Sequence, residues 1–112
     1  MVHILDWNIR ESESYRMSVY DCGDSTVVSN GIFPIRFALK RNPFAFRKTG
    51  ARDTEGLEIW LAQTSIDISS AEIIMSYSVR YTINSKQKIV VLLHVEVTQP
   101  EQMRWDDDNL PF

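Results

Sequence analysis

The sequence predicts an all-β domain, a small antiparallel barrel or sandwich. Three observations lead to this prediction. Apolar residues alternate with polar ones over several stretches, turn-forming residues separate these stretches, and helical periodicity is almost absent. The pattern accommodates five or six short strands within residues 1–100, with one long charged hairpin, which is typical of small β-barrels and sandwiches.

Two strands are expected on either side of the charged hairpin. Residues 33–40 alternate in period two, which predicts a half-buried strand with its cations on the solvent side. Its apolar face carries Phe33, Ile35, Phe37 and Leu39. Residues 56–61 predict the next strand, and residues 41–55, with Pro43 and Gly50, are expected to form a long exposed hairpin between the two.

Two further strands are expected over residues 73–83 and 88–98, which are rich in β-branched and aromatic side chains and are separated by a turn at 84–87. The apolar face of the last strand is expected to carry Val91, Leu93, Val95 and Val97. Weaker strand patterns cover 2–9 and 25–29. The one helical candidate is a single turn at 69–72, where Ser69 would cap the first turn.

Composition indicates an ordinary folded domain: 44% of residues are hydrophobic and 24% are charged. The single cysteine, Cys22, excludes an internal disulfide framework, and no apolar run is long enough to cross a membrane. No signal peptide is visible at the start of the sequence, so we expect a soluble cytoplasmic protein. The sequence has neither a readable catalytic set nor a glycine-rich phosphate loop, so we expect no enzymatic activity, no cofactor and no metal.

Charge is unevenly distributed along the chain. Residues 32–52 contain six cations and no acid, residues 1–100 together are neutral, and residues 101–112 carry the whole net charge of −3. Pro100 is expected to end the last strand. We therefore predict two modules, a binding domain over 1–100 and a flexible acidic tail over 101–112 that binds proteins.

Residues 39–48 interleave cations with Phe44 and Phe46, a combination suited to single-stranded nucleic acid because cations contact phosphates and exposed rings stack on bases. The alternative, in which both rings fold back onto the core, stays open. The candidate stacking residues are Phe44, Phe46, Trp60 and Tyr81. The candidate phosphate contacts are Arg36, Lys40, Arg41, Arg47, Lys48, Arg52, Arg80, Lys86 and Lys88.

Three aspartates precede three apolar residues at the end of the sequence. This order suits a partner with an apolar pocket beside basic groups, and a purely solubilising role would not explain the apolar residues. The predicted partner-binding residues are Asp106, Asp107, Asp108, Leu110, Pro111 and Phe112.

Residues 106–112 resemble the C-terminal tip of bacterial single-stranded DNA-binding (SSB) proteins, with one asparagine inserted, and residues 37–42 and 57–60 are similar to that family's strand–hairpin–strand. The resemblance implies an OB-fold-like barrel that coats single-stranded DNA without sequence preference. It also implies a tip that recruits replication, recombination or repair enzymes, and assembly into dimers or tetramers. The short 63–72 segment and the missing linker before the tip indicate a divergent, minimal member of phage or mobile-element type.

Three alternatives remain at this stage. An adaptor or mimic β-domain would use the SSB-like tip to bind SSB partner proteins without binding DNA. An RNA-binding or primosome-type OB protein would prefer RNA or would not need the tip. A TRAF-like sandwich would share the strand rhythm of 37–82 without accounting for the tip.

Overall fold

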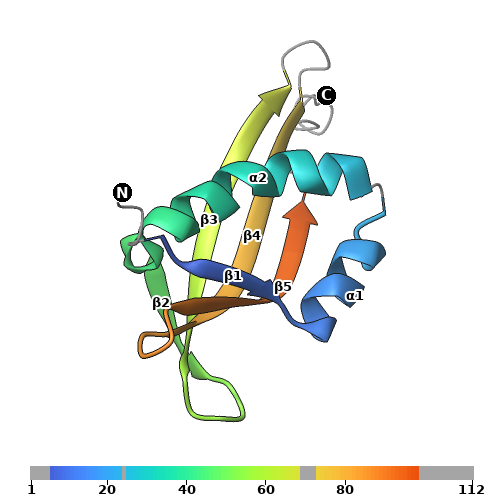
Figure 1. The fold of residues 1–112 in the computed structure, drawn as a ribbon. Coiled ribbons are helices and arrows are strands. Elements are labelled where there is room, and N and C mark those ends of the chain that lie inside the picture. The colour runs from blue at the N-terminus through green and yellow to red at the C-terminus, as the bar shows by residue number, and fades with distance from the viewer. Residues whose placement is uncertain (1–5, 24, 69–72, 99–112) are drawn as a thin grey trace.

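The computed structural model describes residues 6–23, 25–68 and 73–98. The elements follow the order β1 (Asn8–Glu11), α1 (Glu13–Asp21), α2 (Ser25–Arg41), the short 3₁₀ helix η2 (Pro43–Ala45), β2 (Arg47–Arg52), β3 (Glu58–Ile68), β4 (Ile73–Asn84) and β5 (Ile89–Thr98). The fold is therefore mostly β-sheet with two helices (Figure 1).

The five strands form one open mixed sheet in the order β1-β5-β4-β3-β2. β1 is parallel to β5, and the other neighbours are antiparallel. Within the described residues β1 and β2 lie at opposite edges and do not pair, so the expected closed OB-like barrel is wrong. The prediction of a mainly β domain is confirmed.

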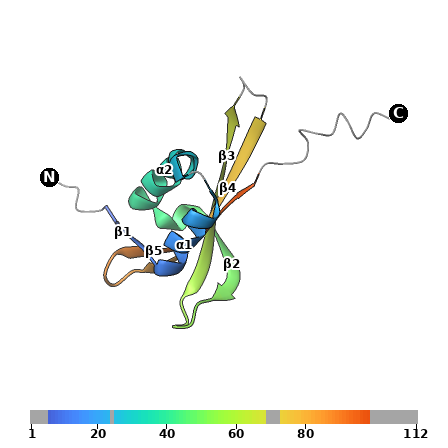
Figure 2. The same cartoon turned by 90° about the vertical axis from the view of Figure 1, so that its right-hand side faces the viewer.

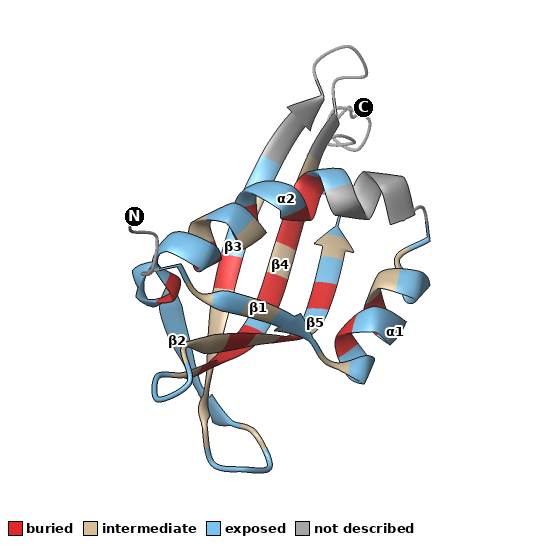
Figure 3. Cartoon of the chain, viewed as in Figure 1, coloured by how far each residue is buried: buried red, intermediate tan, exposed pale blue. Residues whose placement is uncertain are grey.

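Both helices lie on one side of the long β3–β4 ribbon, with α2 crossing the strands and α1 beside β5 (Figures 1 and 2). The buried residues lie in the parts of the strands next to these helices and on the helices themselves (Figure 3). The core combines α1 and α2 side chains with those of the three central strands: Tyr15, Ile32, Ile35, Leu39, Ala62, Tyr77, Val79, Tyr81, Ile83, Val90, Leu92 and Val95. The opposite face has no described helix, and we call it the helix-free face.

Helix α2 replaces the strand expected over 33–40 and the strand expected over 25–29. Ile32, Ile35 and Leu39, spaced three and four residues apart, are buried against the sheet, whereas Phe33 and Phe37 are exposed. Residues 33–40 fit both the two-residue period of a strand and the 3.6-residue period of a helix. They are helical although Pro34 lies inside the helix. The lysine and arginine at its last turn favour the helix C-terminus electrostatically.

Helix α1 occupies a region where the sequence analysis expected no element. Ser12 is its N-cap, and the Ser12 hydroxyl accepts a hydrogen bond from the Tyr15 amide at 3.0 Å. Glu13 in the first turn complements the helix dipole. The expected helical turn at 69–72 lies outside the described residues.

The strands expected from residue 56 onward are confirmed with longer bounds, and Asn84 closes the β4–β5 turn by accepting from the Gln87 amide. The predicted apolar face of β5 is confirmed for Val95 and Val97 and is wrong for Val91 and Leu93. The β4–β5 register shifts between Arg80 and Tyr81, which pair with His94 and Leu92. This bulge reverses the alternation, so Val90 and Leu92 are buried before it and Val95 after it.

Side chains of α1 cover the edge of β5 beyond the part that pairs with β1. The Ser14 hydroxyl donates to the Leu93 carbonyl at 2.8 Å. The Ser18 hydroxyl accepts from the Val95 amide at 3.0 Å and donates to the Tyr15 carbonyl at 2.7 Å. These hydroxyls take the place of a neighbouring strand, because an uncovered edge would leave backbone groups unpaired.

We expect Ser18→Ala to lower the free energy of unfolding by about 1–3 kcal/mol, because the buried Val95 amide loses its acceptor. Ser14→Ala is the matched control, since its hydrogen bond is exposed and water can replace it. Urea denaturation should show a lower midpoint for Ser18→Ala with an unchanged m-value. Equal midpoints for the two variants would show that α1 does not seal this edge.

Candidate protein-interaction site

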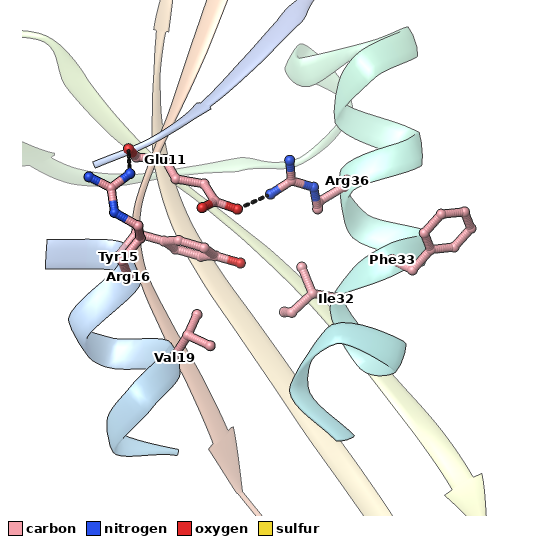
Figure 4. Close-up of a pocket in the computed structure, with 7 residues that line it drawn as sticks. All are labelled: Glu11, Tyr15, Arg16, Val19, Ile32, Phe33 and Arg36. Carbon is pink, nitrogen blue, oxygen red and sulfur yellow. Dashed lines mark hydrogen bonds and ion pairs between the residues drawn. The ribbon is translucent and has the colours of Figure 1, made fainter. Parts of the chain in front are cut away.

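A groove of about 380 Å³ separates α1 from α2 (Figure 4). Tyr15 and Val19 of α1 face Ile32 of α2 across it, while Phe33 lies at its rim and points away from α1. Four of the seven lining residues are aliphatic or aromatic: Tyr15, Val19, Ile32 and Phe33. The groove therefore offers apolar surface that no described part of the chain covers.

One end of the groove is polar. The Arg36 guanidinium forms an ion pair with the Glu11 carboxylate at 2.8 Å, and Arg16 donates to the Glu11 carbonyl at 3.0 Å (Figure 4). Burial raises the pKa of the Tyr15 hydroxyl, and the positive charge of Arg36 partly opposes this rise. The partly exposed ion pair joins the end of β1 to α2 but contributes little stability by itself.

A second feature continues from the groove along the outer side of α2. Its members recur every three to four residues along α2, so they share one side of the helix. We call this surface the α2 strip and define it by Phe33, Arg36, Phe37, Lys40 and Arg41.

The strip combines exposed rings with positive charge. Phe33 and Phe37 are 66% and 55% exposed, and their rings stack with centroids 6.5 Å apart. The Arg41 guanidinium lies 5.5 Å from the centre of the Phe37 ring. Phe37, Lys40 and Arg41 line a pocket of about 320 Å³ together with Asp6. Adjacent exposed aromatic side chains rimmed by charges are typical of a protein-binding surface.

The predicted nucleic-acid residues do not lie together on one hairpin. Arg36, Lys40 and Arg41 belong to the α2 strip. Phe44, Lys48, Trp60 and Lys88 gather around Trp7, whose amide donates to the Lys40 carbonyl at 2.9 Å, so they lie beside the C-terminal end of α2. Arg47 and Arg80 lie on the helix-free face, in a row with Leu61 and His94 that the strand register defines.

Phe44 and Trp60 form a row with Trp7, and we call these three side chains the aromatic row. The Phe44 ring contacts Trp7 and Trp60 edge-on, with centroids 5.5 and 5.7 Å away. The Lys88 and Lys48 ammonium groups lie 5.1 and 5.6 Å from the Trp7 and Trp60 ring centres. Phe44 remains 48% exposed, but Lys48 also pairs with Glu58 at 3.1 Å, so one of these cations is already neutralised.

Tyr81 is a core residue, so its predicted role as a surface aromatic is wrong. It is fully buried, and its hydroxyl donates to the Pro43 carbonyl at 2.7 Å. Burial strongly raises its pKa. Phe46 is half-buried and packs edge-on against Tyr81. This ring is therefore packed against the core and is not an exposed stacking platform.

The remaining predicted cations have separate surroundings. Arg52 donates to the Gly56 carbonyl at 2.6 Å within the β2–β3 turn, and Lys86 is exposed in the β4–β5 turn. The predicted partner-binding residues 106–112 lie outside the described residues, as does the boundary between the two predicted modules, so both stay predictions.

The groove was not predicted from the sequence, and Phe33 and Phe37 were assigned to the wrong side of their element. The signal was present in the spacing of Ile32, Ile35 and Leu39, which marks the buried side of a helix. With that side inward, the two phenylalanines necessarily point outward.

No family model and no curated protein matches this sequence. Among solved structures, the fold is similar to a chain of the crystal structure of the toxin–antitoxin complex RelBE2 from Mycobacterium tuberculosis, with a TM-score of 0.61 and 16% sequence identity. The match covers 85% of the present chain and 94% of that chain. None of the helices in the described part is long and apolar enough to cross a membrane.

This similarity corrects the functional expectations. The matched structure is not an SSB protein, and the open sheet is not an OB barrel. The predicted membership of the SSB family, the coating of single-stranded DNA, the recruitment of SSB partners with or without DNA and the SSB-like oligomer are therefore wrong. The chain shares its fold with a component of a toxin–antitoxin complex.

Proposed function

We propose that this chain is one component of a toxin–antitoxin-type pair and that it works by forming a stable complex with a protein partner. The observation that carries the proposal is the α2 strip, where two neighbouring phenylalanines are more than half exposed. The similarity to a chain of the RelBE2 complex over most of both chains supports it, because that protein also belongs to a two-protein assembly. The prediction that the chain is not an enzyme is part of this proposal.

Burial of the α2 strip under a protein partner is energetically favourable. Removing an exposed phenylalanine side chain from water contributes about 1.5–3 kcal/mol, so two of them form an effective anchor for a partner. The groove between α1 and α2 lies directly beside Phe33 and would take a further apolar side chain. The cations of the strip would select the partner by charge.

The proposal is tested by purifying the tagged full-length chain from its native cells under native expression. We expect a second protein to co-purify in fixed stoichiometry. This protein is identified by mass spectrometry, produced separately and titrated against the chain by calorimetry. Phe33→Ser combined with Phe37→Ser should weaken that binding at least about 100-fold, since each tenfold loss corresponds to about 1.4 kcal/mol. Met17→Ser is the matched control, because Met17 is 57% exposed on α1 and does not line the groove.

Two results would contradict the proposal. Recovery of the chain without a co-purifying protein in fixed stoichiometry would show that the proposed pair does not exist. Equal affinity of the double variant and the Met17→Ser control would show that the partner binds elsewhere.

A further inference from the structure

The C-terminal end of the α2 strip carries charge that the described fold does not neutralise. Arg36 pairs with Glu11, and Lys48 pairs with Glu58. Over the described ranges Lys40 and Arg41 form no ion pair, although Asp6 lines the same pocket. Helix α2 contains no acidic residue at all. This part of the strip therefore suits a ligand that is both acidic and apolar.

The chain itself contains a segment with this chemistry. Residues 101–112 carry a net charge of −3, with three consecutive acids at 106–108. Five apolar side chains accompany them: Met103, Trp105, Leu110, Pro111 and Phe112. The rest of the chain is neutral overall, but α2 carries three cations and no acid, and this local positive charge complements the acidic segment.

We propose that residues 101–112 dock on the α2 strip of their own chain. The aspartates at 106–108 lie against Lys40 and Arg41, and the apolar side chains cover Phe37 and Phe33. The chain length allows it: β5 ends at Thr98, and the eight to ten residues up to the aspartates span up to about 26–36 Å when extended. Helix α2, with 17 residues, is only about 25 Å long.

The aromatic row is a poorer site for the same segment. Lys48 is held by Glu58, and its ammonium also lies over Trp60, so an acidic ligand there would have to displace an existing pair. At the strip, the Arg41 guanidinium lies over the Phe37 ring, and a carboxylate adds to that contact without replacing one. The α2 strip is therefore the favoured site.

One consequence rests on the proposed function. If the protein partner also binds the α2 strip, residues 101–112 compete with it. Neutralising the three aspartates should then tighten partner binding, whereas the docking itself does not depend on any partner.

The docking is tested on the full chain alone, with a carbodiimide that joins a lysine amine to a carboxylate as an amide with loss of water. We expect cross-links from Lys40 to residues 106–108 about tenfold more often than from the exposed Lys86, because docking raises the local concentration of the carboxylates. The Lys48–Glu58 pair, at 3.1 Å, is the internal positive control for the reagent. A mixture of isotope-labelled and unlabelled chains distinguishes links within one chain from links between two.

Cross-links to Lys40 within one chain that disappear in the Asp106→Asn, Asp107→Asn, Asp108→Asn variant support the proposal. Three results overturn it: equal labelling of Lys40 and Lys86, no link to Lys40 while Lys48–Glu58 forms, or Lys40 links found only between chains. The last result would assign the strip to the segment of a second copy. Because no partner is present, each outcome is independent of whether the proposed pair exists.

Discussion

Tyr81→Ala should lower the free energy of unfolding by about 3–5 kcal/mol, a large part of the 5–15 kcal/mol that stabilises a typical domain. The ring is fully buried, stacks on Trp60 at 6.3 Å and meets Phe46 edge-on at 6.5 Å. Its removal leaves a cavity at the centre of the sheet. Urea denaturation followed by tryptophan fluorescence measures the loss.

Two further substitutions make this test specific. Tyr81→Phe removes only the hydrogen bond to the Pro43 carbonyl and should cost about 1 kcal/mol. Tyr20→Ala removes a tyrosine that is 81% exposed and should change stability by less than about 0.5 kcal/mol. If Tyr81→Ala cost no more than Tyr20→Ala, Tyr81 would be a surface residue and the described core would be wrong.

Gly31→Ala should destabilise the protein by about 2–3 kcal/mol, although the same change in an open helix is normally stabilising by about 1 kcal/mol. A Cβ at Gly31 would overlap the ring of Tyr77, so this glycine lets α2 approach the sheet closely. Both residues are buried, which leaves the ring little room to move. Thermal or urea unfolding gives the sign of the effect directly.

A double-mutant cycle with Tyr77→Ala identifies the cause. Removing the ring makes room for the new methyl group, so the double variant should be more stable than the sum of the single effects by about 1–3 kcal/mol. Asn30→Ala, at the exposed neighbouring position, is the control and should be neutral or slightly stabilising. A stabilising Gly31→Ala would mean that α2 lies farther from β4 than the structure places it.

The β-strands were predictable where their composition is unambiguous. Residues 73–83 and 88–98 contain dense β-branched and aromatic side chains and are joined by a turn, and both form strands. The bulge in β5 was not predictable, because a single unpaired residue changes which side chains are buried without changing composition.

The segment of helix α2 was wrongly predicted as a strand because local sequence patterns did not decide its structure. Gly31 and Pro34 lower its intrinsic helix propensity, and the period-two pattern over 33–40 is real. Packing of Ile32, Ile35 and Leu39 on the sheet outweighs both, and such packing is a tertiary effect that local patterns do not contain. Once this segment was taken as a strand, Phe33 and Phe37 were assigned to the core and the α2 strip could not be found.

The resemblance of residues 106–112 to an SSB tip failed for a related reason. A seven-residue match outside the core places no constraint on how residues 1–100 bury their apolar side chains. The buried set determines the fold, and it requires two helices on an open sheet. In our proposal the acidic segment binds α2 of its own chain.

Growth of the host shows whether the chain is part of a toxin–antitoxin-type pair. The chain and the protein that co-purifies with it are expressed separately and together in a host from which both genes have been deleted. We predict that one of the two stops growth when expressed alone, that co-expression restores growth, and that Phe33→Ser with Phe37→Ser prevents this restoration. If neither protein affects growth alone, or if the double variant restores growth as well as the native chain does, a toxin–antitoxin-type pair held together through the α2 strip is contradicted.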